Sequence, residues 1–229
     1  MKKAILVALA LVFAAPLFAI DDDFDNVVYS SANNHVRFEV LSTFGYGYHI
    51  VKSNDFNSNG SSEFFFNVAS LGLYPVDSFG LELGLDCAFN AFDSRNSAFI
   101  LDNERKVQAM EFSTLVAGTP DRHRGNFDVF SLNIPAVAKV KIGDFWLGGG
   151  AVASFNLLGS TTYYYKQDNR REEVTYTRAQ MNRFTYSFVA TLGYGSMGAY
   201  FKYYPASSPL LPEGSVDMSY MTIGLVFDF

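Results

Sequence analysis

The chain ends with Tyr220-Met221-Thr222-Ile223-Gly224-Leu225-Val226-Phe227-Asp228-Phe229, in which large apolar residues recur at every second position. The odd-numbered positions from 221 to 229 hold Met, Ile, Leu, Phe and Phe. Thr, Gly and Asp occupy the even-numbered positions 222, 224 and 228, with Val226 as the exception. A period of two indicates a β-strand and not a helix. The C-terminus is therefore predicted to be a strand with one apolar and one polar face.

The same alternation recurs along the chain and predicts eight strands in total. They cover about residues 36–50, 63–74, 79–92, 128–142, 145–158, 180–195, 197–204 and 218–229. In the second of these segments Phe65, Ala69, Leu71 and Leu73 are expected on the outward face, although Asn67 interrupts that face.

The connections between these segments alternate in length. Residues 75–78, 143–144 and 195–196 form tight turns, whereas 51–62, 93–127, 159–179 and 205–217 are long and polar. Short turns at one end and long loops at the other are typical of bacterial outer-membrane barrels, whose termini are both periplasmic. We therefore predict an all-β fold, a transmembrane eight-stranded antiparallel up-and-down β-barrel with short periplasmic turns and long extracellular loops.

A soluble lipocalin-like barrel is the alternative that the same alternation allows, with its apolar faces turned inward. The interior of such a barrel would have to hold the Phe, Leu and Tyr side chains of all eight segments. The opposite faces are rich in Gly, Ser, Thr and Ala, which suit a narrow lumen. Beyond residue 19 no uncharged stretch approaches the roughly 20 residues of a spanning helix, so a closed barrel is the expected way to cross a membrane.

Composition and the N-terminus limit the compartment and the partners. Of the 229 residues, 49% are apolar and 17% are charged, against about 25% charged in ordinary domains. The net charge of -6 and the lack of a large basic patch argue against nucleic acid as a partner. Cys87 is the single cysteine, which excludes an intramolecular disulfide.

Residues 1–19 are predicted to be a cleaved signal peptide. Lys2 and Lys3 precede the apolar run 4–15, and the small residue Ala19 precedes the expected cut. Residues 20–35 are then an N-terminal periplasmic segment, and 36–229 form the barrel. The predicted location is the outer membrane of a Gram-negative-type (diderm) bacterium.

Two segments carry a resemblance to a known family. Leu132-Asn133-Ile134-Pro135-Ala136-Val137-Ala138-Lys139, followed by a short turn and Trp146-Leu147-Gly148-Gly149-Gly150, resembles the central hairpin of the "outer membrane protein beta-barrel domain" proteins, with their OmpX- and OmpA-like architecture. The C-terminal strand looks like the signal by which such barrels are recognised for insertion. The signal residues expected from this resemblance are Tyr220, Ile223, Leu225, Phe227 and Phe229.

The resemblance implies a small barrel that the outer-membrane assembly machinery inserts. It implies no single activity, because relatives include adhesins, narrow channels, structural barrels and a few lipid-modifying enzymes.

The polar faces of the predicted strands place a set of charged residues in the lumen. These are four bases and four acids, namely Arg37, Glu39, Glu82, Asp86, Lys139, Lys141, Lys202 and Asp228. Charges in a narrow, partly desolvated interior must pair, since an unpaired one costs several kcal/mol. They are expected to form either a neutral network that plugs the barrel or a gate whose pairs exchange partners to open a thin path.

No catalytic or metal site is expected. Asp121-Arg122-His123 offers an acid and a base, but adjacency in sequence does not orient a dyad. His49 beside the serines of 53–62 lacks a supporting motif, and no metal-ligand spacing occurs. We expect no cofactor and no enzymatic activity.

The long loops are the remaining candidate for function. Tyr163-Tyr164-Tyr165 and the charged residues 166–173 predict a hairpin that projects beyond the membrane, and 103–112 suggests a short surface helix. Tyr and Arg commonly anchor interfaces, although aromatic residues also form the membrane girdle. The expected role is structural or surface-interacting through the loops, with a narrow channel for small solutes as the alternative. The expected partners are outer-membrane lipids, the assembly machinery and an extracellular partner, and the protein is expected to be a monomer.

Overall fold

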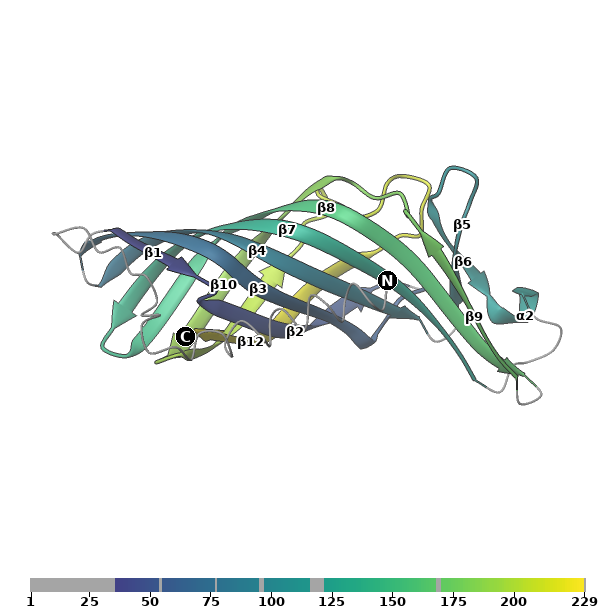
Figure 1. The fold of residues 1–229 in the computed structure, drawn as a ribbon, viewed down its shortest axis with the longest axis horizontal. Helices are drawn as coiled ribbons and strands as arrows, with labels where there is room; N and C mark the ends of the chain where they lie inside the picture. The colour runs from purple at the N-terminus through teal and green to yellow at the C-terminus, as the bar shows by residue number, and fades with distance from the viewer. Residues whose placement is uncertain are drawn as a thin grey trace, which may run out of the picture.

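A computed structural model describes residues 36–53, 55–76, 78–94, 97–115, 122–167 and 170–228 (Figure 1). The expected signal peptide 1–19 and the segment 20–35 lie outside the described residues, as do Asp121 and Phe229. Within the described ranges, no helix is long and apolar enough to cross a membrane.

The wall of the molecule is built from long antiparallel strands. They are β1 (Val36–Val40), β2 (Thr43–Lys52), β3 (Asn57–Val76), β4 (Phe79–Ser94), β7 (Arg122–Ile142), β8 (Phe145–Gln167), β10 (Phe184–Tyr194), β11 (Met197–Tyr203) and β12 (Ser219–Asp228). Both β1 and β2 pair with β3, and Leu41, which has a φ of 53°, lies between them. The two are one barrel strand with a bend.

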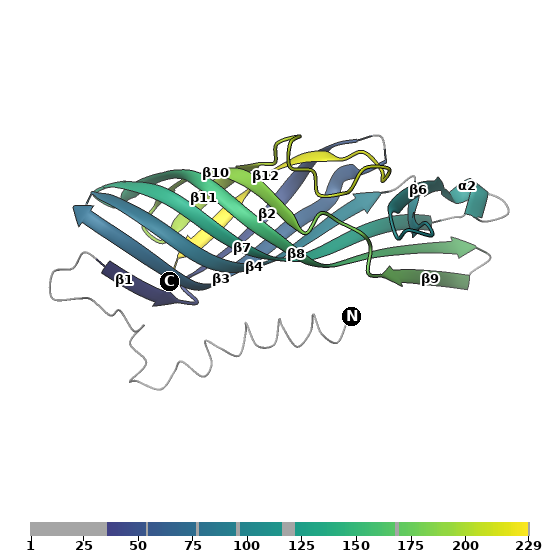
Figure 2. The ribbon, with the colours of Figure 1, turned by 90° about the horizontal axis from the view of Figure 1, so that it is seen from above.

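The strands close into a ring because β3 pairs with β2 on one side and with β4 on the other. The order around the ring is β3, β2, β12, β11, β10, β8, β7, β4 and back to β3. Counting β1 with β2, the barrel has eight strands, and Figure 2 shows them tilted across its wall. The predicted fold class, a closed eight-stranded antiparallel barrel, is confirmed.

The barrel is apolar outside and polar inside over its central region. Along β4, the odd-numbered residues Leu81 and Leu83 are 47% and 51% exposed. The even-numbered residues Asp86 and Asn90, on the opposite face of the strand, are buried. The same holds on β10, where Phe188 is 52% exposed and Ser187 is buried. An apolar surface that continues around all eight strands is far larger than the patches that water-soluble monomers expose. We call this surface the apolar belt.

The predicted orientation of Phe65 is wrong. Phe65 is buried inside the barrel together with Glu63 and Asn67, whereas Leu71 and Leu73 face outward as expected. The cause is a β-bulge, because the register with β4 shifts between Asn67 and Ala69. An extra residue in one strand moves every following side chain to the other face.

At the end with the long connections, strands extend beyond the barrel and carry additional elements. β9 (Arg170–Thr177) pairs with the end of β8 and forms the predicted hairpin. β5 (Ser97–Leu101) pairs with β6 (Val107–Glu111), and α2 (Phe112–Leu115) follows. The helix predicted over 103–112 is wrong, since 107–111 is a strand whose Val107 is fully buried. Tertiary packing here overrides local helix preference.

Candidate functional site

The interior has three levels, which we take from the end with tight turns (the turn end) to the end with long connections (the loop end). A cavity of about 660 Å³ occupies the turn end. All eight charged residues predicted for the lumen line it: Arg37, Glu39, Glu82, Asp86, Lys139, Lys141, Lys202 and Asp228.

Lys139 is the centre of the ion pairs in this cavity. Its Nζ lies 3.2 Å from Glu82 Oε2 and 3.9 Å from Asp228 Oδ2, and it sits 4.9 Å from the centre of the Trp146 ring. The Tyr74 hydroxyl donates a hydrogen bond of 2.6 Å to Glu82. These side chains are about a quarter to a third exposed, so each pair is worth little on its own.

Of the other predicted lumen residues, Arg37 reaches this group through Tyr74, whereas Asp86 and Lys202 have partners of their own. The Arg37 guanidinium lies over the Tyr74 ring at 4.6 Å, and Asp86 accepts a 2.9 Å hydrogen bond from Asn67. Among the described residues, neither Glu39 nor Lys141 has an ion-pair partner within 4 Å. The eight charges therefore share one cavity without forming one connected network.

The second level is a buried ion pair in the middle of the barrel. Lys202 Nζ lies 2.7 Å from Glu63 Oε1, and the side chains are 5% and 0% exposed. The Tyr200 hydroxyl donates to the other Glu63 oxygen at 3.0 Å, and Lys202 lies 4.5 Å from the centre of the Phe65 ring. Glu63 is the residue that the sequence prediction missed. The break at Asn67 in the alternation of β3 was the available signal for the bulge that turns Glu63 inward.

His49 and Thr222 mark the transition to the third level. The two residues pair across β2 and β12, and a 2.8 Å hydrogen bond joins His49 Nδ1 to the Thr222 hydroxyl. The His49 ring stacks on Phe92 at 4.6 Å and meets Tyr220 edge-on at 5.1 Å. His49 is thus held by packing and by its hydrogen bond with Thr222.

The third level, at the loop end, is apolar. We call it the loop-end plug. Its buried residues are Phe56, Phe92, Phe99, Val107, Phe127, Val129, Ala179, Leu210, Leu211, Met218 and Tyr220. They come from barrel strands, from β5 and β6, and from the connections between β2 and β3, β9 and β10, and β11 and β12. Phe92 and Phe127 are completely buried inward-facing residues of β4 and β7.

Outside the plug, the extended strands and the β5–β6 hairpin pack against each other. Ala98, Phe112 and Tyr163 form the buried centre of this contact. His123, for which no catalytic role was expected, lies 4.6 Å from the Phe112 ring centre, where it serves packing. In the turn of the hairpin, the backbone N–H of Lys106 donates to Asp102 at 2.9 Å, which lowers the pKa of that carboxyl.

The residues of the expected insertion signal lie on both faces of β12. Ile223 and Leu225 are 52% and 53% exposed on the apolar belt, whereas Tyr220 is buried in the loop-end plug. Phe227 stacks on Phe44 at 4.8 Å. In the described ranges, no cluster of three or more His, Cys, Asp or Glu side chains is placed to hold a metal ion.

The closed barrel, its polar interior and its apolar belt define a class of protein. In a bilayer every backbone polar group must be paired, and a closed barrel meets this condition because it has no free edge. The chain is therefore a transmembrane β-barrel of the outer-membrane class, located in the outer membrane of a Gram-negative-type bacterium.

Comparisons with known proteins add architectural likenesses only. No protein-family model matches the sequence, and no curated protein matches it. The solved structures that resemble it include Ail, the attachment invasion locus protein of Yersinia pestis, at 12% identity and a TM-score of 0.35 over 85% of this chain and 98% of that one. The outer membrane protease OmpT of Escherichia coli matches at 10% identity and a TM-score of 0.35, over 85% of this chain and 95% of that one.

The class assignment rests on the strand pairing and on the apolar belt.

Proposed function

We propose that the protein is a non-enzymatic surface-interaction protein of the outer membrane, with a lumen closed at the loop end and a binding surface made by the extended strands. The observation that carries this proposal is the loop-end plug. Its aromatic side chains fill the barrel where a permeation path would have to leave it, and Phe92 and Phe127 are fully buried there. Interiors packed in this way have few voids larger than a water molecule.

The architecture of the loop end also supports the proposal. β7, β8 and β9 continue as a three-stranded sheet, and the β5–β6 hairpin packs on one face of it. Binding sites are commonly carried by segments that a rigid scaffold positions. A packed extension of this kind offers a partner a preorganised surface, which lowers the ordering cost of binding.

The remaining expected partners are part of the proposal. Outer-membrane lipids contact the apolar belt. The assembly machinery recognises the C-terminal strand, whose Ile223 and Leu225 face outward. The barrel acts as a monomer, since its sheet has no unpaired edge within the ring.

Exchange of residues 166–173 for a Gly/Ser segment is expected to abolish adhesion of cells that carry the protein while leaving the barrel folded. The exchange removes the tip of the β8–β9 hairpin, including Lys166, Arg171 and Glu172, and of the pairings between ring strands it touches only the last one of β7 with β8, at Lys166. Adhesion to a surface of host or envelope material is counted for cells producing each variant, and heat-modifiable migration on a gel checks folding.

The matched control is the same exchange at 143–144 in the turn end. It should leave adhesion unchanged, because the turn end lies at the opposite end of the barrel (Figure 1). If adhesion survives exchange of 166–173 in a folded barrel, the proposal fails.

A narrow channel for small solutes is the second candidate. The observation in its favour is the charged cavity of about 660 Å³ at the turn end. A channel would need the loop-end plug to open, with Lys139 exchanging between Glu82 and Asp228. Conductance distinguishes the two candidates.

A further inference from the structure

A histidine lies at the boundary between the central ion pair and the loop-end plug. His49 is 0% exposed, and on one side its ring stacks on Phe92 at 4.6 Å and meets Tyr220 edge-on at 5.1 Å. Both of these rings belong to the plug, where Phe92 also contacts Phe56 and Phe127. The imidazole is therefore packed as a part of the plug, although it is a side chain that can take up a proton.

The other side of His49 faces the central ion pair. Lys202, Thr222 and His49 form one register row across β11, β12 and β2. Neighbouring strands are about 4.8 Å apart, so the backbones of Lys202 and His49 are separated by about 10 Å across Thr222. Glu63 on β3 is in register with Gly47, two residues before His49 on β2. The imidazole thus lies between an apolar core and a buried pair of charges.

The closed arrangement has no place for a second cation. Both oxygens of Glu63 are engaged, one with Lys202 at 2.7 Å and the other with the Tyr200 hydroxyl at 3.0 Å. On the His49 ring, Nδ1 is bonded to Thr222, and Nε2 has no hydrogen-bond partner among the described residues. A buried charge without a partner is costly, and a neighbouring aromatic ring compensates a cation only in part. The plug as it stands accommodates the uncharged ring.

We propose that protonation of His49 opens the loop-end plug. An imidazolium has to be hydrated, and the central ion pair occupies the side of the ring that faces the turn end. The way to water therefore leads through the plug, and taking it separates His49 from Phe92 and Tyr220, whose own ring centres are 4.9 Å apart. Acid outside the cell is the signal that this device detects, and at neutral pH the loop end stays closed.

The direction of the effect follows from proton uptake. The titratable groups that surround His49 are Glu63 of β3, Lys202 of β11, Tyr204 after β11 and Tyr220 of β12. Asn90 and Phe92, which face it from β4, do not titrate. In water only histidine among these side chains changes its charge between about pH 5 and 8. Because the closed plug fits the uncharged ring and the opened one fits both forms, opening takes up a proton and is favoured as the pH falls, by at most about tenfold per pH unit.

The test is amide hydrogen exchange of the refolded barrel in lipid nanodiscs, at neutral pH and at about pH 4.5, followed by mass spectrometry. Protection is compared in residues 97–111 and 205–217, which contribute Phe99, Val107, Leu210 and Leu211 to the plug. After correction for the intrinsic pH dependence of exchange, protection of these two segments should fall about tenfold or more in acid.

Two variants remove the titrating group. His49→Phe keeps an aromatic ring to stack on Phe92, and His49→Gln keeps a polar side chain beside Thr222. Both should retain the protection of the plug segments in acid, because neither takes up a proton at this position. Heat-modifiable migration on a gel checks that each variant is folded, and the second variant keeps the test valid if the first does not fold.

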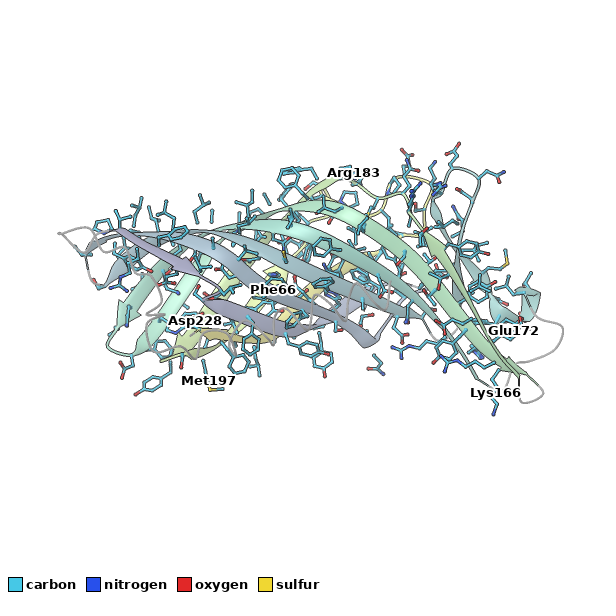
Figure 3. The ribbon with its side chains drawn as sticks, in the orientation of Figure 1. Phe66, Lys166, Glu172, Arg183, Met197 and Asp228 are labelled. Atoms are coloured by element: carbon cyan, nitrogen blue, oxygen red, sulfur yellow. The ribbon has the colours of Figure 1, made fainter. Side chains whose placement is uncertain are left out.

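The matched control is His123→Gln. His123 packs on Phe112 outside the plug, so its removal should leave the response of the plug to acid unchanged. The turn-end hairpin 136–147 is an internal reference whose protection should not change. It lies at the opposite end of the barrel, and Figure 3 shows the length between the two ends, with Asp228 towards the turn end and Glu172 at the tip of the loop end.

Three results would overturn the inference. The first is equal protection of the plug segments at both pH values, and the second is an equal fall in the natural protein and in both His49 variants. The third is a fall that includes the turn-end hairpin to the same extent, which would mean that acid unfolds the whole barrel. The inference goes beyond the proposed function, because adhesion through residues 166–173 at neutral pH does not depend on His49. Failure of one therefore leaves the other standing.

Discussion

Replacement of Glu63 by alanine is expected to lower the free energy of unfolding of the barrel by about 3–5 kcal/mol, the usual cost of removing one partner of a buried ion pair. The Lys202 ammonium would remain in the middle of the barrel, 95% buried, without the carboxylate at 2.7 Å that now compensates it. The Tyr200 hydroxyl would lose its acceptor in the same change. Unfolding by urea in lipid vesicles, followed by the fluorescence of Trp146, measures the effect.

Two further variants show how much of the loss in free energy of unfolding comes from the unpaired buried charge and how much from lost side-chain packing. The double variant Glu63→Gln with Lys202→Met removes both charges and should recover most of the loss, because it leaves no uncompensated ion. Glu82→Ala removes a carboxylate that pairs with Lys139 at 3.2 Å with both side chains about a quarter exposed, and it should cost at most about 1 kcal/mol. Equal losses for Glu63→Ala and Glu82→Ala would contradict the assignment of the central pair.

Replacement of Phe127 by alanine should also destabilise the barrel by about 3–5 kcal/mol, the range for a large side chain removed from a packed core. Phe127 is 0% exposed in the loop-end plug and lies 6.0 Å from Phe92 between ring centres. The same urea unfolding measures the loss. Phe127→Leu, which keeps more of the volume, should cost less than about 1.5 kcal/mol. A Phe127→Ala barrel as stable as the natural one would show that the loop end is loosely packed.

The fold could be predicted from the sequence because a period of two is a strong signal when many strands repeat it. Ile223 and Leu225 on β12, like Phe188 on β10, face outward as their parity requires. The closed ring then follows from the number of strands and from the need to pair every backbone group in a bilayer. Two tight turns could also be predicted, because each contains a glycine. Gly143 and Gly195 have φ values of 61° and 56°, which favour glycine.

The interior was less predictable for reasons specific to particular residues. The alternation of side chains between the two faces of a strand is reversed at a β-bulge. Because the register shifts after Asn67, Phe65 faces inward and not outward as expected, and Glu63 was not predicted to lie in the lumen. Leu210 and Leu211 lie in a connection without regular strands, where no period indicates burial, yet they complete the loop-end plug. The loop end could not be foreseen as a packed core because its contacts join segments far apart in the sequence.

The central claim is that the barrel is closed and acts through its loop end, and single-channel recording tests it most directly. Residues 20–229 are refolded, inserted into a planar bilayer and recorded at neutral pH, with heat-modifiable migration as proof of folding. The account predicts an inserted barrel that shows no conductance steps. Well-defined steps that change on Lys139→Ala would contradict it and establish a gated pore.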